Sequence, residues 1–123
     1  MAPAPVQRLE ADPASVRAAR RAVSAAVDGQ LDEDAFDRLL LCASETVTNA
    51  IEHGQPPIEL VVDVGEDRVR VHVRDASPGP LQVRDPGPNA VRGRGLMIVE
   101  RCADAWGVDD TGAGKDVWFE IKR

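Results

Sequence analysis

The stretch 58–75 restricts the fold of this chain more than any other, because two apolar segments flank a short polar turn. Its second half alternates strictly, with Val69, Val71 and Val73 on one side and Arg68, Arg70, His72 and Arg74 on the other. A period of two is typical of a strand with one buried and one solvated face. With the turn at 65–67, the stretch predicts an antiparallel hairpin. His72 falls on the polar side, so we expect it at the surface and not as a metal ligand.

A hairpin with one apolar face needs a second layer to cover it, and three segments have apolar side chains at helical period. The first two begin with acidic residues, which favour a helix N-terminus, and end at glycines, which favour a C-terminus. The segments are 12–29 between Asp12-Pro13 and Gly29, 32–53 between Asp32 and Gly54, and a third that begins at Gly95 and ends near Arg101.

Three further segments, 6–9, 105–108 and 117–121, are expected to be strands. The resulting order is strand, helix, helix, hairpin, loop, helix, hairpin, which separates helices from runs of antiparallel strands. This order predicts one domain, 1–123, with an α+β fold. We expect a two-layer sandwich in which a mostly antiparallel mixed sheet is covered on one face by about three helices.

Composition excludes several functional classes. A net charge of −6 and a pI near 4.8 argue against a nucleic-acid partner, which would require a basic surface. No apolar run approaches the roughly 20 residues of a membrane span, and the start lacks a secretory pattern, so we expect a cytoplasmic protein without a membrane partner. Cys42 and Cys102 are too few for a metal site and are expected to be reduced, mostly buried thiols, although the sequence alone does not exclude a disulfide.

The segment 76–94 is rich in Pro and Gly and has no usable periodicity. A loop of this length inside a compact domain is typically a functional lid or a disordered segment, and we interpret it as a lid. It concentrates positive charge, with Arg84, Arg92 and Arg94 against a single Asp85. Residues 1–5 are expected to be frayed.

Three candidate site features follow one another along the chain. Glu45, Asn49 and Glu52 fall on one helical face, where they could hold a hard cation and activate a hydroxyl; the alternative is a solvated polar face. Asp75 ends a buried strand and leads into a Pro/Gly turn, a pattern that also occurs as plain turn chemistry. The segment 93–95, Gly-Arg-Gly, opens a helix whose unpaired N–H groups favour a phosphate, although a lone G-x-G is equally typical of a turn.

In this order the features resemble the GHKL family of ATP-binding domains (the Bergerat fold, within the histidine kinase-like ATPase superfamily). They resemble most closely its anti-sigma-factor serine-kinase branch. Segment 45–54 (ETVTNAIEHG) is similar to the N box, 73–79 (VRDASPG) to the first glycine box, and 93–99 (GRGLMIV) to the second. The resemblance covers nearly the whole chain, from position 12 to the strand ending near position 120. Each motif alone is weak evidence, whereas the ordered set with these spacings is strong.

The resemblance implies ATP and Mg²⁺ as cofactors and a role for each matching residue. Asn49 would chelate the Mg²⁺ that bridges the ATP phosphates, and Glu45 would act as base for the incoming hydroxyl. Asp75 would accept a hydrogen bond from the adenine amino group, and Gly79 would leave room for the nucleoside. Gly93, Arg94, Gly95 and Leu96 would hold the phosphates, and Arg84 and Arg92 are either charge-neutralising groups or solvated loop charges.

The chain departs from the family pattern in two places. Ser77 replaces the first glycine of the usual Asp-x-Gly-x-Gly box. Where relatives often carry a Thr after a Gly-Lys pair, this chain has Lys115-Asp116. That Thr usually supports the adenine-binding Asp through its hydroxyl. We therefore expect Asp116 to bring negative charge near Asp75 and to affect nucleotide affinity.

The function implied is that of a cytoplasmic protein serine kinase. It would use Mg-ATP to phosphorylate a serine on a small anti-anti-sigma (STAS-type) partner, and would sequester a sigma factor when that partner is inactive. One alternative is a partner-switch module without kinase activity, with or without ATP. Another is a histidine-kinase-type catalytic domain, although no dimerisation helix or phosphoacceptor His is evident. Homodimerisation through the helical face at 17–21 or the edge strand near Val6 is also left open.

Overall fold

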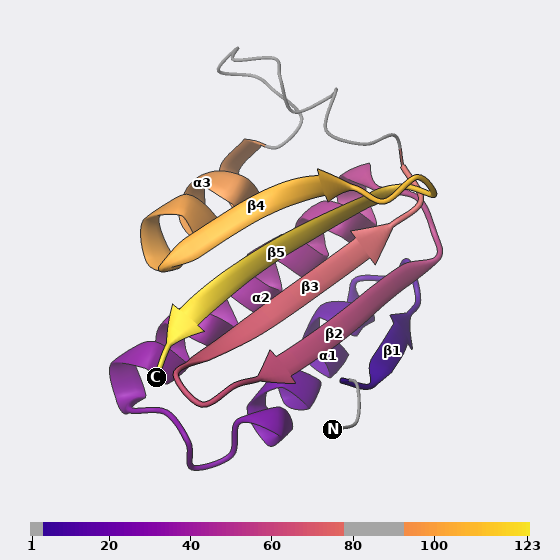
Figure 1. The fold of residues 1–123 in the computed structure, drawn as a ribbon. Helices are drawn as coiled ribbons and strands as arrows, with labels where there is room; N and C mark the ends of the chain where they lie inside the picture. Colours follow the sequence, from indigo (N-terminus) through magenta and orange to yellow (C-terminus); the bar gives the residue numbers. More distant parts are fainter. Residues whose placement is uncertain (1–3, 78–92) are drawn as a thin grey trace.

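A computed structural model describes residues 4–77 and 93–123, with the backbone alone for residues 93–95. In these residues the elements follow the predicted order (Figure 1). The elements are β1 (Val6–Leu9), α1 (Ala14–Ala26), α2 (Glu33–His53), β2 (Ile58–Val64), β3 (Arg68–Asp75), α3 (Gly93–Cys102), β4 (Ala105–Asp110) and β5 (Lys115–Lys122). The third helix begins two residues earlier than expected, and both closing strands are longer. The predicted frayed start and the lid fall largely outside the described residues.

The five described strands form one sheet in the order β1-β2-β3-β5-β4. Each of its neighbouring pairs is antiparallel. The last strand of the sequence, β5, therefore lies between β3 and β4. Its register places Val117 opposite Val73 and Lys115 opposite Asp75. The predicted α+β class is confirmed.

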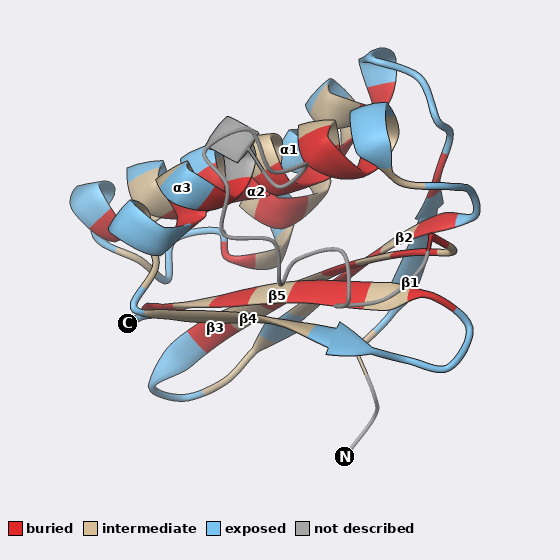
Figure 2. Ribbon diagram, turned by 90° about the horizontal axis from the view of Figure 1, so that it is seen from above, coloured by how far each residue is buried: buried red, intermediate tan, exposed pale blue. Residues whose placement is uncertain are grey.

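The three described helices cover one face of the sheet, and the core lies between the two layers (Figure 2). The valines of the alternating stretch are fully buried there, as predicted, and face α2. Burial of each large aliphatic side chain stabilises the fold by about 1.5–3 kcal/mol. The principal core residues are Val23, Leu39, Val47, Ile58, Leu60, Val69, Val71, Val73, Val99, Phe119 and Ile121.

The helix starts predicted from acidic residues are confirmed. Asp32 caps α2, because its Oδ1 accepts the N–H of Ala35 at 2.8 Å. Asp12 Oδ1 accepts the N–H of Ala14 at 2.8 Å just before α1, which begins at Ala14 with Pro13 in the N-cap position. Past the end of α1, Gly29 has φ +70, a left-handed conformation that glycine adopts without strain.

The open face of the sheet is covered in part by its own side chains. The His72 side chain is only 16% exposed, and its Nδ1 lies 2.9 Å from Asp116 Oδ2. Beside it, the Arg70 guanidinium lies over the Trp118 ring, 4.1 Å from the centroid. His72 therefore lies on the open face of the sheet, as expected, but it is only partly exposed. Register explains the lower exposure, since it brings a carboxylate 44 positions away beside the imidazole.

The two cysteines are free, as expected. Cys42 is fully buried in α2, and this burial raises the pKa of its thiol to about 12. Such a thiol is chemically inert at neutral pH. Among the described residues, no helix combines the length and the apolar character needed to cross a membrane.

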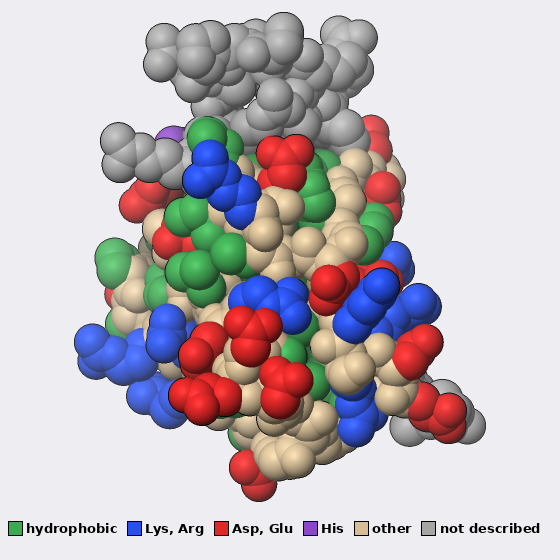
Figure 3. All heavy atoms as spheres, turned by 90° about the vertical axis from the view of Figure 1, so that its left-hand side faces the viewer, with side chains coloured by type: hydrophobic (Ala, Val, Ile, Leu, Met, Phe, Trp, Pro, Cys, Tyr) green, Lys and Arg blue, Asp and Glu red, His purple; other side chains and the backbone are tan. Residues whose placement is uncertain are grey.

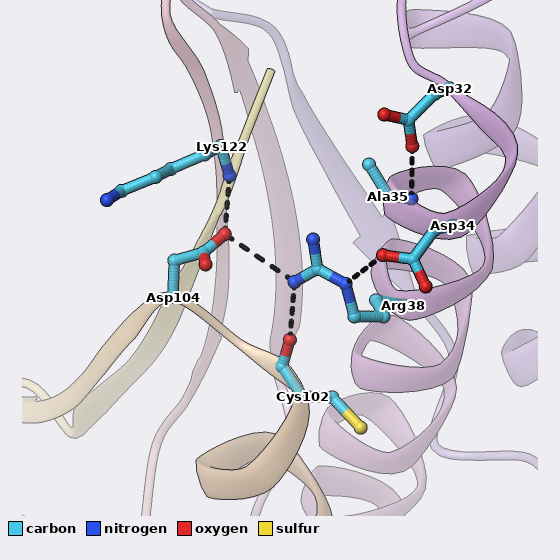
Figure 4. A network of polar contacts seen from close by, with 7 residues as sticks. All are labelled: Asp32, Asp34, Ala35, Arg38, Cys102, Asp104 and Lys122. Carbon is cyan, nitrogen blue, oxygen red and sulfur yellow. Dashed lines mark hydrogen bonds and ion pairs between the residues drawn. The ribbon is translucent and has the colours of Figure 1, made fainter.

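Arg38 joins the start of α2 to the end of α3 and to the β4–β5 hairpin (Figure 4). Its guanidinium donates to Asp34 Oδ2 at 3.0 Å and to the Cys102 carbonyl at 2.8 Å, and its Nη1 lies 3.5 Å from Asp104 Oδ2. The same Asp104 oxygen accepts the backbone N–H of Lys122 at 2.7 Å. The side of the molecule that lies to the left in Figure 1 carries acidic and basic side chains close together, beside hydrophobic ones (Figure 3).

We expect Asp104→Asn to make stability less dependent on pH in the acid range. The N–H of Lys122 and the Arg38 guanidinium hold the pKa of Asp104 below its ordinary value. A carboxylate with a depressed pKa stabilises the fold above its unfolded-state pKa, near 4, and this contribution disappears as pH falls through the folded-state value. Urea titrations at pH 7 and pH 3 should show a loss of about 1 kcal/mol for the variant at pH 7 and a smaller loss at pH 3.

The matched control is Asp37→Asn, because Asp37 is an exposed carboxylate on α2. It should change the free energy of unfolding by less than about 0.5 kcal/mol at either pH. An equal loss for Asp104→Asn at both pH values would contradict the role of the carboxylate charge.

Candidate nucleotide-binding site

The end of α2, the end of β3 and the start of α3 lie at one edge of the molecule, the upper edge in Figure 1. Just past β3, the N–H of Ala76 donates to the carbonyl of Gln55, just past α2, at 2.8 Å. Helix α3 packs against α2. The three sequence motifs, distant in the chain, therefore come together at this edge.

The N-box segment places Glu45 and Asn49 one turn apart on α2, which Val47 and Ala50 anchor in the core. Glu45 is half-buried and Glu52 is exposed, whereas Asn49 is only 9% exposed. The alternative of a uniformly solvated polar face is therefore wrong at Asn49. A buried amide needs polar partners, so its position suits a ligand of a metal or a phosphate-bound cation.

Asp75 ends β3 on the side of the sheet that faces the helices, and its side chain is only 1% exposed. Its Oδ1 accepts the backbone N–H of Ser77 at 2.7 Å and also the Ser77 hydroxyl. Its Oδ2 is buried and accepts no hydrogen bond from the described residues. A buried carboxylate oxygen of this kind is an acceptor prepared for a donor from a ligand.

Gly54, at the end of α2, lies directly against that carboxylate. A Cβ at this position would lie 2.7 Å from both Cγ and Oδ2 of Asp75. The φ angle of Gly54 is −91, which any residue can adopt, so conformational freedom does not explain the glycine. The close approach of Asp75 does, together with the Ala50 carbonyl oxygen, which would lie 2.6 Å from the same Cβ. Gly114 has a similar role on the other side, because a Cβ there would overlap the Asp75 carbonyl oxygen and lie 2.7 Å from Ala76 Cα.

The neighbour of Asp75 on β5 is Lys115 and not Asp116. Lys115 Nζ lies 3.1 Å from Asp75 Oδ2 and donates to Ser77 Oγ at 2.7 Å. Asp116 points to the opposite face, where it pairs with His72 and lies 3.6 Å from Arg74 Nε. The expectation that Asp116 places negative charge near Asp75 is therefore wrong, because adjacent residues of a strand face opposite sides.

The second glycine box forms the first turn of α3, which begins at Gly93. The N–H groups of the first four residues of a helix have no partner within the helix, and these residues are Gly93, Arg94, Gly95 and Leu96. Leu96 is buried, so its backbone N–H is what it can offer to a ligand. Gly79, Arg84 and Arg92 lie outside the described residues, as does the Arg94 side chain.

The family model of the histidine kinase-like ATPase domain matches residues 9–121. The chain belongs to this family. It is also similar in structure to the histidine kinase domain of the blue-light activated histidine kinase of Erythrobacter litoralis EL346, with a TM-score of 0.57 and 20% sequence identity. The similarity covers 89% of this chain and 59% of that chain, and at this identity it shows the fold alone. No curated protein matches the chain in sequence.

A histidine kinase-like ATPase domain has an ATP-binding, kinase-like function.

Three features of the site were not evident from the sequence. They are the Lys115–Asp75 ion pair, the tight passage at Gly114, and the contact of Gly54 with Asp75. The sequence carried one indication of the first, because Lys115 precedes the alternating strand at 117–121 by two positions and so shares a face with Val117.

Proposed function

We propose that this domain binds Mg-ATP and transfers the γ-phosphoryl group to a serine of a small anti-anti-sigma (STAS-type) protein. It sequesters a sigma factor while that partner is inactive. The main support for ATP binding is the state of Asp75 Oδ2. This buried acceptor has no hydrogen bond from the described residues and belongs to the edge where α2 ends and α3 begins. The choice of serine and of these partners is supported by the resemblance of the three motifs to the serine-kinase branch.

The residues of the site have separate roles in binding and transfer. Asp75 accepts a hydrogen bond from the adenine amino group, and the N–H groups of the first turn of α3 bind phosphate oxygens. The Asn49 side-chain oxygen would hold Mg²⁺, and the bound ion would neutralise charge on the phosphates. Glu45 accepts the proton of the attacking serine hydroxyl.

The residues present fit Mg²⁺, which is commonly held by one or two protein groups together with substrate phosphates. Among the described residues, His, Cys, Asp and Glu form no group of three that could hold a metal ion. A Mg²⁺ ion held by one protein amide together with substrate phosphates does not require such a group. Asn49 is therefore the candidate metal ligand of this part of the chain.

A second candidate function is a partner switch without kinase activity. The observation that favours it is the ion pair between Lys115 and Asp75, because the carboxylate expected to bind adenine already has a cation beside it. The two candidates differ in their product. Acid-stable phosphoserine on an anti-anti-sigma protein incubated with this domain and Mg-ATP identifies the kinase, and its absence despite nucleotide binding identifies the switch.

We expect Asn49→Ala to remove the dependence of ATP binding on Mg²⁺. Calorimetric titration of the unchanged domain should show tighter ATP binding with Mg²⁺ than with a chelator, by at least about tenfold. In the variant the two affinities should be equal, because the proposed protein ligand of the metal is gone.

Glu52→Ala is the control, since Glu52 lies one turn after Asn49 on α2 and is exposed. It should retain the full Mg²⁺ dependence. Mg²⁺-dependent binding that persists in Asn49→Ala would show that the metal is held elsewhere. Absence of ATP binding in the unchanged domain under all conditions would refute the proposed function itself.

A further inference from the structure

A lysine side chain lies on the core side of strand β5, beside the proposed base-binding carboxylate. The Lys115 side chain is 12% exposed and that of Asp75 is 1% exposed. Lysine is almost never buried to this extent unless its charge is paired, because desolvation of an ammonium is costly. Asp75 provides the pair, so the fold holds both charges in the same small region.

The hydrogen bonds around this pair are incomplete. An ammonium carries three N–H donors. Within the residues that the structure describes, one of them donates to Ser77 Oγ at 2.7 Å. Asp75 Oδ2 lies 3.1 Å from Nζ, yet it is buried and accepts no hydrogen bond from the described residues. The pair therefore presents a donor and an acceptor side by side.

The partners of Ser77 fix this arrangement. Its hydroxyl donates to Asp75 Oδ1 and accepts from Lys115, so it links the two charged groups. Because Oδ1 is occupied by the N–H and hydroxyl of Ser77, Oδ2 is the carboxylate oxygen left to accept from a ligand, beside Lys115 Nζ. Gly54 lies directly against the Asp75 carboxylate, and Gly114 lies directly against the Asp75 backbone carbonyl, so close packing restricts both the side chain and the backbone of Asp75.

We infer that Lys115 reads the nucleotide base together with Asp75, an inference that rests on the proposed binding of ATP. The edge of adenine presents an amino donor at C6 next to the ring acceptor N1. The amino group donates to Asp75 Oδ2, and the Lys115 ammonium donates to N1. The adjacent acceptor and donor of the protein thus match the adjacent donor and acceptor of the base. Lys115 is in this sense a specificity-determining residue.

The test compares ATP with 1-deaza-ATP, in which N1 is replaced by a CH group that cannot accept a hydrogen bond. A hydrogen bond to a charged donor corresponds to about a tenfold change in affinity or more. Calorimetric titration of the unchanged domain should therefore show 1-deaza-ATP binding at least about tenfold more weakly than ATP. This comparison needs no variant, so it does not depend on the folding of an altered chain.

Lys115→Met keeps the length of the side chain and removes the charge. This variant should bind ATP and 1-deaza-ATP with the same, reduced affinity. Lys122→Met, on the same strand but with an exposed side chain, should retain the discrimination of the unchanged domain. If Lys115 only held Asp75 in place, its replacement would lower the affinity for both nucleotides. The unchanged domain would then bind ATP and 1-deaza-ATP with equal affinity.

The outcomes separate this inference from the proposed function. Equal affinities for ATP and 1-deaza-ATP in the unchanged domain, or discrimination that survives in Lys115→Met, overturn the role of Lys115 while ATP binding stands. If the unchanged domain binds neither nucleotide, the proposed function fails and the inference fails with it.

Discussion

Replacing Glu45 with glutamine is expected to slow phosphoryl transfer to serine by about 100- to 10,000-fold while leaving ATP affinity nearly unchanged. Glutamine keeps the size and the hydrogen-bonding capacity of the side chain but does not accept the proton of the attacking hydroxyl. Glu45 is half-buried one turn before Asn49, so the proposed base and the proposed metal ligand project from the same part of α2. The measurement is the rate of phosphoserine formation on a supplied anti-anti-sigma protein, with ATP affinity determined by calorimetry.

Glu52→Gln is the matched control, because it makes the same chemical change at an exposed position two turns further along α2. Its transfer rate should remain within about twofold of the unchanged domain. A Glu45→Gln variant that transfers phosphate at the normal rate would exclude Glu45 as the base. Weakened ATP binding in that variant would instead assign Glu45 to nucleotide binding.

Gly114→Ala is expected to lower the free energy of unfolding by about 3 kcal/mol or more and to weaken ATP binding. The added Cβ would overlap the Asp75 carbonyl oxygen and lie 2.9 Å from Asp75 carbonyl carbon, so the β3 and β5 backbones must separate. That separation displaces the Asp75 side chain from Lys115 and from the proposed base site. Urea denaturation measures the first effect and calorimetry with ATP the second.

Gly112→Ala is the control that distinguishes the effect of steric overlap at Gly114 from the effect of backbone strain. Gly112 has φ +83 and nothing within 4 Å of an added Cβ, so alanine there meets only the strain of a left-handed conformation. That strain costs about 1–2 kcal/mol and should leave ATP affinity unchanged. If Gly114→Ala were no more destabilising than Gly112→Ala, the close approach at Asp75 would have no energetic importance.

Patterns local to the chain predicted most of the fold. The alternation of three valines identified the buried face of β3, and Asp32 identified the start of α2, because both depend only on near neighbours in sequence. They also placed Glu45 and Asn49 on one helical face. The burial of Asn49 was not predictable in this way, since it depends on what packs over α2.

Contacts between distant strands account for the errors. The register of β3 with β5 decides whether Lys115 or Asp116 faces Asp75, and a shift of one residue exchanges the two. The same register places His72 beside Asp116, which lowers the exposure of the imidazole. Neither relation can be recognised within a window of a few residues, so the composition of the proposed base-binding end of the site required the structure.

The position of β5 also has a consequence for how the domain is made. Synthesis proceeds from the N-terminus, and β5, which follows every other described element, lies between β3 and β4 in the finished sheet. Until Lys115 leaves the ribosome, the Asp75 carboxylate has no counter-charge from β5 and β3 has an unpaired edge. Nascent chains of this domain therefore lack part of the proposed nucleotide site, and the proposed recognition of ATP requires the finished sheet.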